Sequence, residues 1–93
     1  MIKSFGCKRT AVVFSGKFPK GFPPDIFAVA RRKLRMLDAT TRLTDLRNPP
    51  SNHLEALMGD RAGQYSIRIN DQWRICFLWL EENVHEVEIV DYH

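Results

Sequence analysis

The sequence has few of the residues that metal and cofactor sites require. Its 2 cysteines, Cys7 and Cys76, are far apart, and the histidines at positions 53, 85 and 93 do not have the spacing of a zinc site either. The 5 glycines are scattered, which excludes a glycine-rich phosphate loop, and no Gly-x-Ser-x-Gly nucleophile elbow occurs. We therefore expect no cofactor and no metal, and two reduced cysteines that serve as packing residues.

Long hydrophobic runs are also missing. No apolar stretch approaches the roughly 20 residues that a membrane span needs. Charged residues at positions 3, 8 and 9 interrupt any apolar core of a signal peptide. With 93 residues, 44% hydrophobic and 27% charged, the chain has the composition of one soluble globular domain over residues 1–93. We expect a cytoplasmic protein with no membrane partner.

The charge is distributed unevenly along the chain. Residues 1–47 contain 11 Lys or Arg and 3 Asp, whereas residues 48–93 contain 3 Arg and 8 Asp or Glu. The basic half predicts an anionic partner, and charge alone allows either a phosphate backbone or an acidic protein.

The first 24 residues predict short elements separated by a breaker-rich connection. Residues 2–5 fit a short first strand, and residues 7–16 fit one or two helical turns ended by Gly16. Residues 17–24 contain three prolines and a glycine, which excludes a regular element there.

A longer helix is predicted from Asp25, a candidate N-cap, to residue 38 or 39, because the apolar positions in this segment share one face. Lys33 lies at the margin of that face and would have to extend its ammonium group to solvent. The opposite face is basic and is equally compatible with a solvated surface and with a docking surface for RNA or a protein. Its residues are Arg31, Arg32 and Arg35.

The second half of the chain changes period. Residues 40–53 predict an irregular linker in which Pro49 and Pro50 exclude a regular helix. Beyond it, alternating apolar and polar residues predict three strands joined by tight turns, over residues 64–69, 73–80 and 84–93. An antiparallel meander with N-terminal helices packed on one face gives an α+β domain.

This second half also contains the residue types that metal-free cleavage of RNA requires. Such cleavage through the neighbouring 2′-hydroxyl needs a general base, a general acid and a fixed cation. The candidates are Glu55, Arg68, Arg74, Tyr92 and His93.

Each candidate also has a purely structural explanation. Glu55 fits a solvated carboxylate, and a terminal His93 fits a frayed chain end. Arg74 fits a cross-strand pair with Glu86 or Glu88.

The aromatic residues leave a similar choice. Tyr65, Trp73 and Trp79 could stack on bases, but their alternation with apolar neighbours favours the core for at least two of them. Met58 fits packing better than a ligand role. Composition and spacing alone therefore indicate a small basic α+β domain that could bind RNA.

Two longer patterns are more specific. One is L-x-G-D-R-x-G-x-x-S-I-R-I-N-x-x-W-R-I-x-F at residues 57–77, and the other is D-Y-H at residues 91–93. Together with "MIKSF" and "ARRKLRMLDATT", they make the chain resemble a HigB-type toxin of the RelE superfamily over essentially its whole length. The resemblance implies a toxin of a type II toxin–antitoxin system, an mRNA endoribonuclease that acts on the ribosome and inhibits translation and growth. It also implies neutralisation by a HigA-like helix-turn-helix antitoxin, with operator DNA contacted only through that antitoxin.

The resemblance implies roles for individual residues. His93 is the general acid, Tyr92 orients the substrate or stacks on a base, and Asp91 holds His93 in position. Arg74 stabilises the scissile phosphate with its planar, always-charged fork. Weaker candidates for RNA contacts are Arg61 and Arg68, and the basic helix face would contact ribosomal RNA or an acidic stretch of antitoxin through Arg31, Arg32 and Arg35.

One departure from the family pattern limits the expected activity. Several relatives have His-Pro-Leu-Lys-Gly where this chain has residues 55–59, so a histidine and a lysine are both missing. Glu55 resembles the YoeB branch, which implies the role of general base. Met58 removes one phosphate contact, which costs about 1.5–3 kcal/mol, or about ten- to a hundredfold in rate. We expect a mild nuclease; the alternatives are a non-catalytic ribosome-binding or co-repressor module, and a generic nucleic-acid surface.

Overall fold

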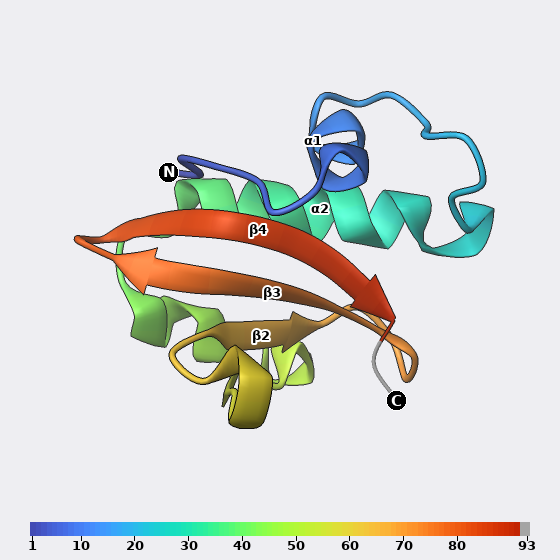
Figure 1. Cartoon of the computed structure of the whole chain (residues 1–93). Helices are drawn as coiled ribbons and strands as arrows, with labels where there is room; N and C mark the ends of the chain where they lie inside the picture. The colour runs from blue at the N-terminus through green and yellow to red at the C-terminus, as the bar shows by residue number, and fades with distance from the viewer. Residues whose placement is uncertain (92–93) are drawn as a thin grey trace.

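Helices occupy the first half of the chain and strands the second, as predicted (Figure 1). The computed structural model describes residues 1–91. Its helices are α1 (Lys8–Phe14) and α2 (Phe27–Ala39), and its strands are β1 (Glu55–Ala56), β2 (Tyr65–Arg68), β3 (Trp73–Leu80) and β4 (Asn83–Asp91). Short 3₁₀ helices connect them at Pro24–Ile26, Leu43–Arg47, Pro50–Asn52 and Gly59–Arg61. None of the helices in residues 1–91 has the length and hydropathy of a membrane span.

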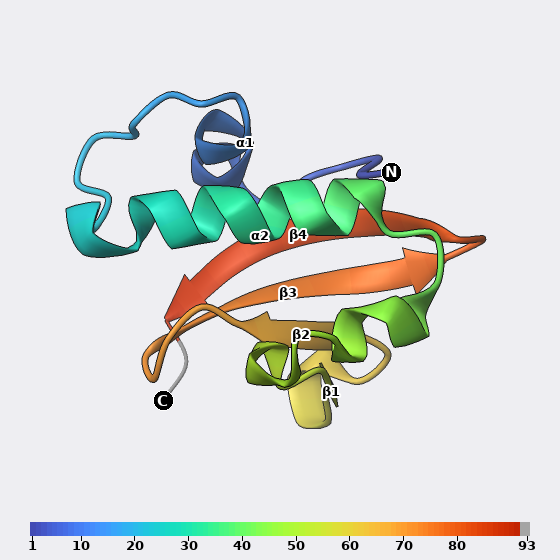
Figure 2. The ribbon, with the colours of Figure 1, turned by 180° about the vertical axis from the view of Figure 1, so that it is seen from behind.

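The strands form an antiparallel sheet in the order β1-β2-β3-β4, and α2 lies across one of its faces (Figures 1 and 2). Strand alternation decides which side chains meet the helices. Ile67, Ile75 and Ile89 are aligned across three strands and are buried in the core beneath the helices. The next register row contains Arg68 and Arg74, which therefore belong to the face that the helices leave uncovered. The fold class, α+β with the helices on one side of a meander, is confirmed.

A bulge in β4 preserves this division. Val84 and Val87 are both fully buried although they are three positions apart, which a regular alternation does not allow. The register between β3 and β4 shifts between Cys76 and Leu78, and Glu86 has φ 52°. The extra residue changes the phase of the strand, so both valines contribute to the core.

The N-terminal segment runs along the outer edge of β4. Instead of the predicted strand, it forms isolated parallel bridges at Ile2 with Val84 and at Phe5 with Val87. The N–H of Ile2 also donates to Asp38 Oδ1 at the end of α2, at 2.9 Å. The segment thus covers an edge of the sheet while β1 forms the other edge.

The predicted N-cap at Asp25 is wrong. Asp25 lies inside the 3₁₀ helix Pro24–Ile26, and Ile26 occupies the N-cap position of α2 without a side-chain cap. Pro23 and Pro24 start a separate 3₁₀ turn just before the residue at which the apolar pattern predicts the helix to begin, because proline favours the first helical position. The predicted end of the helix at residue 39 is confirmed.

Lys33 does not extend to solvent as predicted. It is only 5% exposed, and its Nζ donates a hydrogen bond to Oδ1 of the fully buried Asn52. Burial lowers the pKa of Lys33, and the positive charge of Arg32 lowers it further. The amide of Asn52 in turn donates to the Leu46 carbonyl at 3.1 Å.

The linker at residues 40–53 is therefore more ordered than predicted. Leu46 and Asn52 within it are fully buried, and Pro50 begins one of its 3₁₀ helices. The network of Lys33, Asn52 and Leu46 ties this segment to α2. As a consequence, the residues that follow, from position 53, enter the sheet at a fixed place.

Candidate functional site

Arg74 lies on the uncovered face of the sheet and is held by neutral acceptors. Its Nε donates to Ser66 Oγ at 2.8 Å, and its Nη2 donates to the His53 carbonyl at 2.6 Å. The side chain is 10% exposed. Burying a cation is costly unless its N–H groups are hydrogen-bonded, so these contacts fix the guanidinium in one orientation. The result is a positive charge that is already positioned before any ligand binds.

Glu55 lies beside this cation. Its Oε1 is 3.6 Å from Arg74 Nη2, and its side chain is 52% exposed. Strand β1 makes this possible because it pairs Glu55 with Ser66, the residue that binds Arg74. Glu55 and Arg74 are both predicted site residues, and the structure brings them together. Glu55 is a partly solvated carboxylate that also forms an ion pair.

The proposed pairing of Arg74 with Glu86 or Glu88 is wrong. The register of β4 places Val90 opposite Arg74, and Glu88 instead accepts a hydrogen bond from Arg61 Nη2 at 3.0 Å. Glu86 lies at the bulge, where its Oε1 accepts from Ser4 Oγ at 3.4 Å. The charge pattern alone could not show this, because the bulge shifts the register.

Cys76 lies in the same face of the sheet, between Ser66 and Glu88 in the register. It is fully buried, and burial raises the pKa of its thiol; the charges of Arg61 and Glu88 act in opposite directions on it. The predicted packing role of Cys76 is confirmed. Within residues 1–91, no group of three or more His, Cys, Asp and Glu side chains is arranged to hold a metal ion.

The end of β4 lies next to Arg74. Asp91 is the register partner of Trp73, one position from Arg74, and its Oδ2 accepts from Gln72 Nε2 at 3.0 Å. Arg68, on the adjacent strand, pairs with Asp71 in the turn between β2 and β3. Tyr92 and His93, the other residues predicted for the site, lie outside the described residues.

The sequence pattern gives a wrong role to one residue near the site and does not reveal the groups that orient Arg74. Met58 is 87% exposed, so the predicted packing role is wrong; Leu57 is the buried residue of that pair. Ser66 and the His53 carbonyl, which orient Arg74, were not identified, because an acceptor on a distant segment leaves no periodic signal. The core membership predicted for at least two of the three large aromatics is confirmed, since all of them pack against the core: Tyr65, Trp73 and Trp79.

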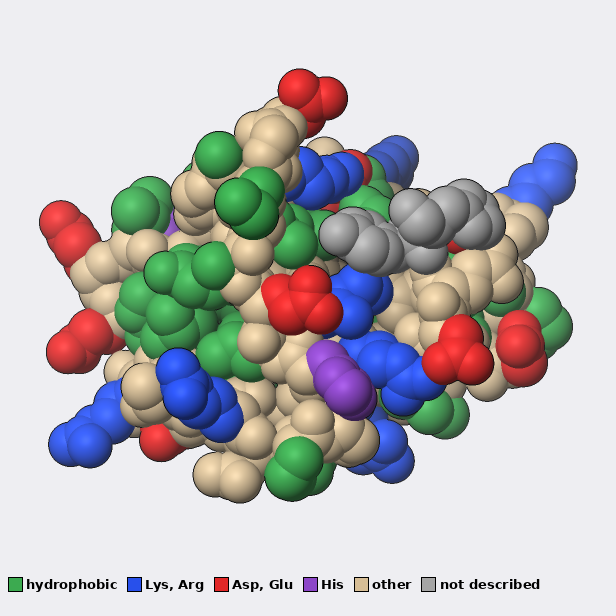
Figure 3. Space-filling model, turned by 90° about the horizontal axis from the view of Figure 1, so that it is seen from below, with side chains coloured by type: hydrophobic (Ala, Val, Ile, Leu, Met, Phe, Trp, Pro, Cys, Tyr) green, Lys and Arg blue, Asp and Glu red, His purple; other side chains and the backbone are tan. Residues whose placement is uncertain are grey.

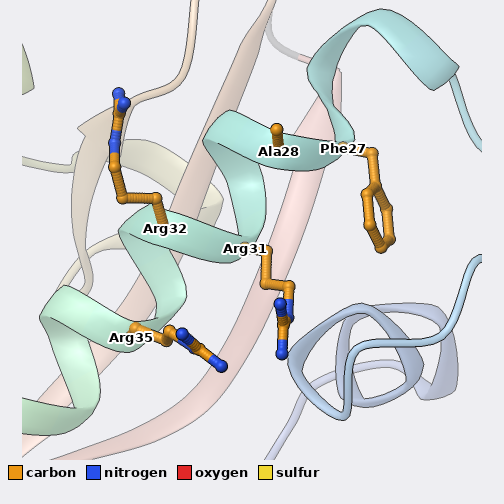
Figure 4. Close-up of a pocket in the computed structure, with 5 residues that line it drawn as sticks. All are labelled: Phe27, Ala28, Arg31, Arg32 and Arg35. Atoms are coloured by element: carbon orange, nitrogen blue, oxygen red, sulfur yellow. The ribbon is translucent and has the colours of Figure 1, made fainter.

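The basic face of α2 lies on the other side of the molecule. Figure 4 shows Arg31 and Arg35 extending to one side of the helix while Arg32 extends away from them. With Phe27 and Ala28 they line a cavity of about 260 Å³. Arg31 Nε is buried without a hydrogen-bond partner among the described residues. This surface carries positive charge and no carboxylate lines its cavity, whereas the uncovered sheet face places Glu55 beside Arg74.

Comparisons with known proteins place the chain in one family. A family model described as "RelE-like toxin of type II toxin-antitoxin system HigB" matches residues 12–93. Endoribonuclease HigB of Proteus vulgaris is 31% identical over 93 residues, the full length of both chains. Toxin HigB-1 of Vibrio cholerae is 44% identical over 59 residues, which are 63% of this chain and 62% of that protein. An uncharacterized protein of Haemophilus influenzae is 38% identical over 65 residues, 70% of this chain and 64% of its own length. The chain thus spans less than two thirds of the length of these last two relatives.

A solved structure supports the fold. The YoeB-YefM complex from Staphylococcus aureus contains a chain that superimposes with a TM-score of 0.56, over 100% of this chain and 98% of that one. The sequence identity is 15%, so the likeness concerns the fold alone.

Proposed function

This chain belongs to the HigB family of RelE-like toxins of type II toxin–antitoxin systems, and on that premise we propose that it is a mild, ribosome-dependent endoribonuclease that cuts mRNA without a metal. Cleavage of mRNA would inhibit translation and growth in the cytoplasm. The observation that carries the proposal is the ion pair of an accessible Glu55 with a fixed Arg74 on the uncovered face of the sheet.

The proposed reaction is an internal displacement at phosphorus. Glu55 accepts the proton of a ribose 2′-hydroxyl, and the resulting oxygen attacks the adjacent phosphorus. The bond from phosphorus to the 5′-oxygen of the next nucleotide breaks, and His93 donates a proton to that oxygen. The products are a 2′,3′-cyclic phosphate and a free 5′-hydroxyl, so neither water nor an oxidant is consumed.

Arg74 has the electrostatic role in this scheme. Negative charge grows on the phosphoryl oxygens as the 2′-oxygen attacks, and a cation fixed in advance stabilises it without reorganising. Hydrogen bonds to Ser66 and to the His53 carbonyl supply that fixation. Asp91 would hold His93, and Tyr92 would orient the substrate or stack on a base.

Further arginines would bind the substrate and its carrier. Arg61 and Arg68 lie on the same face as Arg74, each beside a carboxylate, and a phosphate would compete for them. The basic face of α2 would contact ribosomal RNA or the antitoxin through Arg31, Arg32 and Arg35. We expect a HigA-like helix-turn-helix antitoxin as the partner, with operator DNA contacted only through it.

Mapping the 5′ ends of transcripts tests the proposal. The protein is induced in bacteria that lack the antitoxin, beside a His93→Gln variant and an Arg42→Ala control, which removes an exposed arginine outside the site. We expect new mRNA ends with the original chain and the control, and none with His93→Gln. Purified protein should cut the same message only when ribosomes are added.

Two results would overturn the nuclease function. Growth arrest with intact mRNA would favour the non-catalytic ribosome-binding or co-repressor module. Tight binding to random duplex RNA without ribosomes, with steep salt dependence and no cleavage, would favour a generic nucleic-acid surface.

A further inference from the structure

A second pocket lies at the β1 edge of the sheet, beside the candidate site. It encloses about 260 Å³ between the 3₁₀ helix Leu43–Arg47 and the first two strands. On the face seen in Figure 3, hydrophobic side chains gather to one side of a group of acidic, basic and histidine side chains. We call it the edge pocket; its lining residues are Leu43, Thr44, Arg47, Leu54, Ala56 and Tyr65.

The edge pocket and the candidate site share strand β1. Glu55 pairs with Ser66 and points to Arg74, whereas its chain neighbours Leu54 and Ala56 line the pocket. Alternation along a strand sends successive side chains to opposite faces. The two sites are thus the two sides of one short edge strand, and a flexible polymer passing over that edge meets both.

The chemistry of the edge pocket fits a flat heterocycle. Tyr65 is half-buried and stacked on Phe77, with ring centroids 6.2 Å apart and an interplanar angle of 29°, so its ring is held in place. Apolar walls at Leu43 and Leu54 complete a slot beside it. Nucleobases in single strands bind proteins by stacking on aromatic rings and within apolar slots.

The polar groups at the rim fit the rest of a nucleotide. Thr44 is exposed, and its hydroxyl can both donate to and accept from a base edge. Arg47 is exposed and forms no ion pair with a carboxylate in the part of the chain that the structure describes, so its charge is available to a phosphate.

We propose that the edge pocket binds the nucleobase next to the scissile phosphate and thereby sets which base is preferred there. The inference rests on the proposed function, because it takes RNA as the substrate of the neighbouring site. A nucleobase is favoured over a side chain of a protein partner because two pocket residues, Leu54 and Ala56, directly flank Glu55 in the chain, and because the cation and hydroxyl at the rim suit a nucleotide.

Pocket-filling variants test this binding. Ala56→Leu occupies the pocket from an exposed position, and Thr44→Val removes the hydroxyl without changing the shape; Thr41→Val is the matched control, an exposed threonine outside the pocket. Base frequencies on both sides of each cut are compared by 5′-end mapping. Loss of stacking should reduce cutting at the preferred base about tenfold or more in Ala56→Leu. Thr44→Val should change the order of preference, and Thr41→Val should leave it unaltered.

The outcomes distinguish failure of the base site from failure of the proposed nuclease function. If the original chain makes no cuts, the proposed function fails. If Ala56→Leu cuts with unchanged base preference while Glu55→Gln does not cut, the function stands and the edge pocket is not a base site.

A binding measurement gives an independent answer. The four nucleoside 5′-monophosphates are titrated into the purified protein and followed by amide chemical shifts. Shifts at Thr44, Arg47 and Ala56 that Ala56→Leu abolishes support a base site. Shifts confined to Arg74 and its neighbours overturn it. A base site is also overturned if purified antitoxin shifts the pocket amides and none of the nucleotides does.

Discussion

The arginines on the uncovered side of the sheet and those of helix α2 are held in different ways. Each of the three on the sheet side lies within ion-pair distance of a carboxylate, whereas within residues 1–91 none of the three on α2 does. The sheet pairs are Arg61 with Glu88, Arg68 with Asp71, and Arg74 with Glu55. The α2 residues are Arg31, Arg32 and Arg35.

The difference indicates two roles for these arginines: fixing the orientation of a bound group, and attracting an anionic surface. A guanidinium held by fixed acceptors keeps one geometry, which a reaction at a single phosphate requires. Unpaired arginines on a helix surface keep their full charge and attract an anionic surface over distances of about a Debye length, about 8–10 Å in physiological salt. The sheet-side group would therefore act at the cleaved RNA, with Arg74 in the catalytic role, and the α2 group would act in association. The two groups should respond differently to substitution and to salt.

Arg74→Lys should have the largest effect on activity. Lysine keeps the charge but cannot maintain hydrogen bonds to both Ser66 and the His53 carbonyl in the same geometry. We expect cleavage to fall by about a hundred- to a thousandfold. Single-turnover cleavage on stalled ribosomes measures the loss, and urea unfolding shows whether the fold is retained. Full activity in a folded Arg74→Lys variant would show that charge alone is needed.

Glu55→Gln should have the next largest effect. The amide preserves the size of the side chain but cannot accept the 2′-hydroxyl proton, so the rate should fall about a hundredfold. Stability should change by less than about 1 kcal/mol, because the carboxylate is half-exposed and its ion pair is screened by solvent. Cleavage rates and unfolding midpoints are measured on the same preparations. Asp60→Asn, an exposed carboxylate four residues beyond the β1 strand, serves as the control.

Reversing two exposed charges on α2 should weaken association without affecting the chemistry. Arg32→Glu with Arg35→Glu is preferred, because Arg31 also packs against Gly16. Ribosome affinity should fall about tenfold at low salt, with a shallower salt dependence, while the cleavage rate of bound complexes is unchanged. Lys17→Glu with Lys20→Glu changes the net charge equally in an exposed loop. Equal losses in both variants would assign the effect to overall charge.

Lys33→Met should leave cleavage intact and reduce the free energy of unfolding by about 1–3 kcal/mol, because the buried Asn52 Oδ1 loses its donor. Lys20→Met, at an exposed position, should stay within about 0.5 kcal/mol of the original chain. The comparison shows how a buried cation on α2 differs from the exposed arginines of the same helix. Urea unfolding of all three proteins gives the values.

The difference in the free energy of unfolding between the original chain and Lys33→Met should depend on pH, and the lowered pKa of Lys33 gives the direction of the change. The pKa of Lys33 in the folded protein lies below its ordinary value of 10.5, so the unfolded state holds the proton more tightly. Below the lowered pKa, the original chain carries the full cost of burying the charge. As pH rises through that pKa towards 10.5, the original chain should gain stability relative to Lys33→Met. A constant difference across this range would show that Lys33 is not desolvated in solution.

The periodic elements could be predicted from the sequence because each depends on local chemistry. Helix α2 and the strands β2, β3 and β4 follow from their apolar spacing, and Gly16, with φ 92°, ends the first helix as its position indicated. Residue chemistry offered Glu55 and Arg74 as candidates for one site, but only the resemblance to a family gave each of them a role. A strand of two residues, β1, shows no measurable period.

Features that depend on distant contacts could not be predicted. Lys33 is buried because Asn52, 19 residues away, accepts a hydrogen bond from its ammonium group. The sequence around Lys33 does not indicate that partner. The bulge at Glu86 shifts the register of β4, so Glu88 lies opposite Cys76 and pairs with Arg61. In both cases the tertiary packing decided between local alternatives that the sequence leaves open.

The N-terminal segment has a consequence for the protein when it is separated from its partner. By lying along β4, it blocks that side of the sheet, and in the described part of the chain the opposite border is a strand of only two residues. Long unpaired strands are templates on which further copies assemble into fibrous aggregates. Molecules that are not bound to an antitoxin should accordingly stay dispersed in solution instead of forming insoluble deposits.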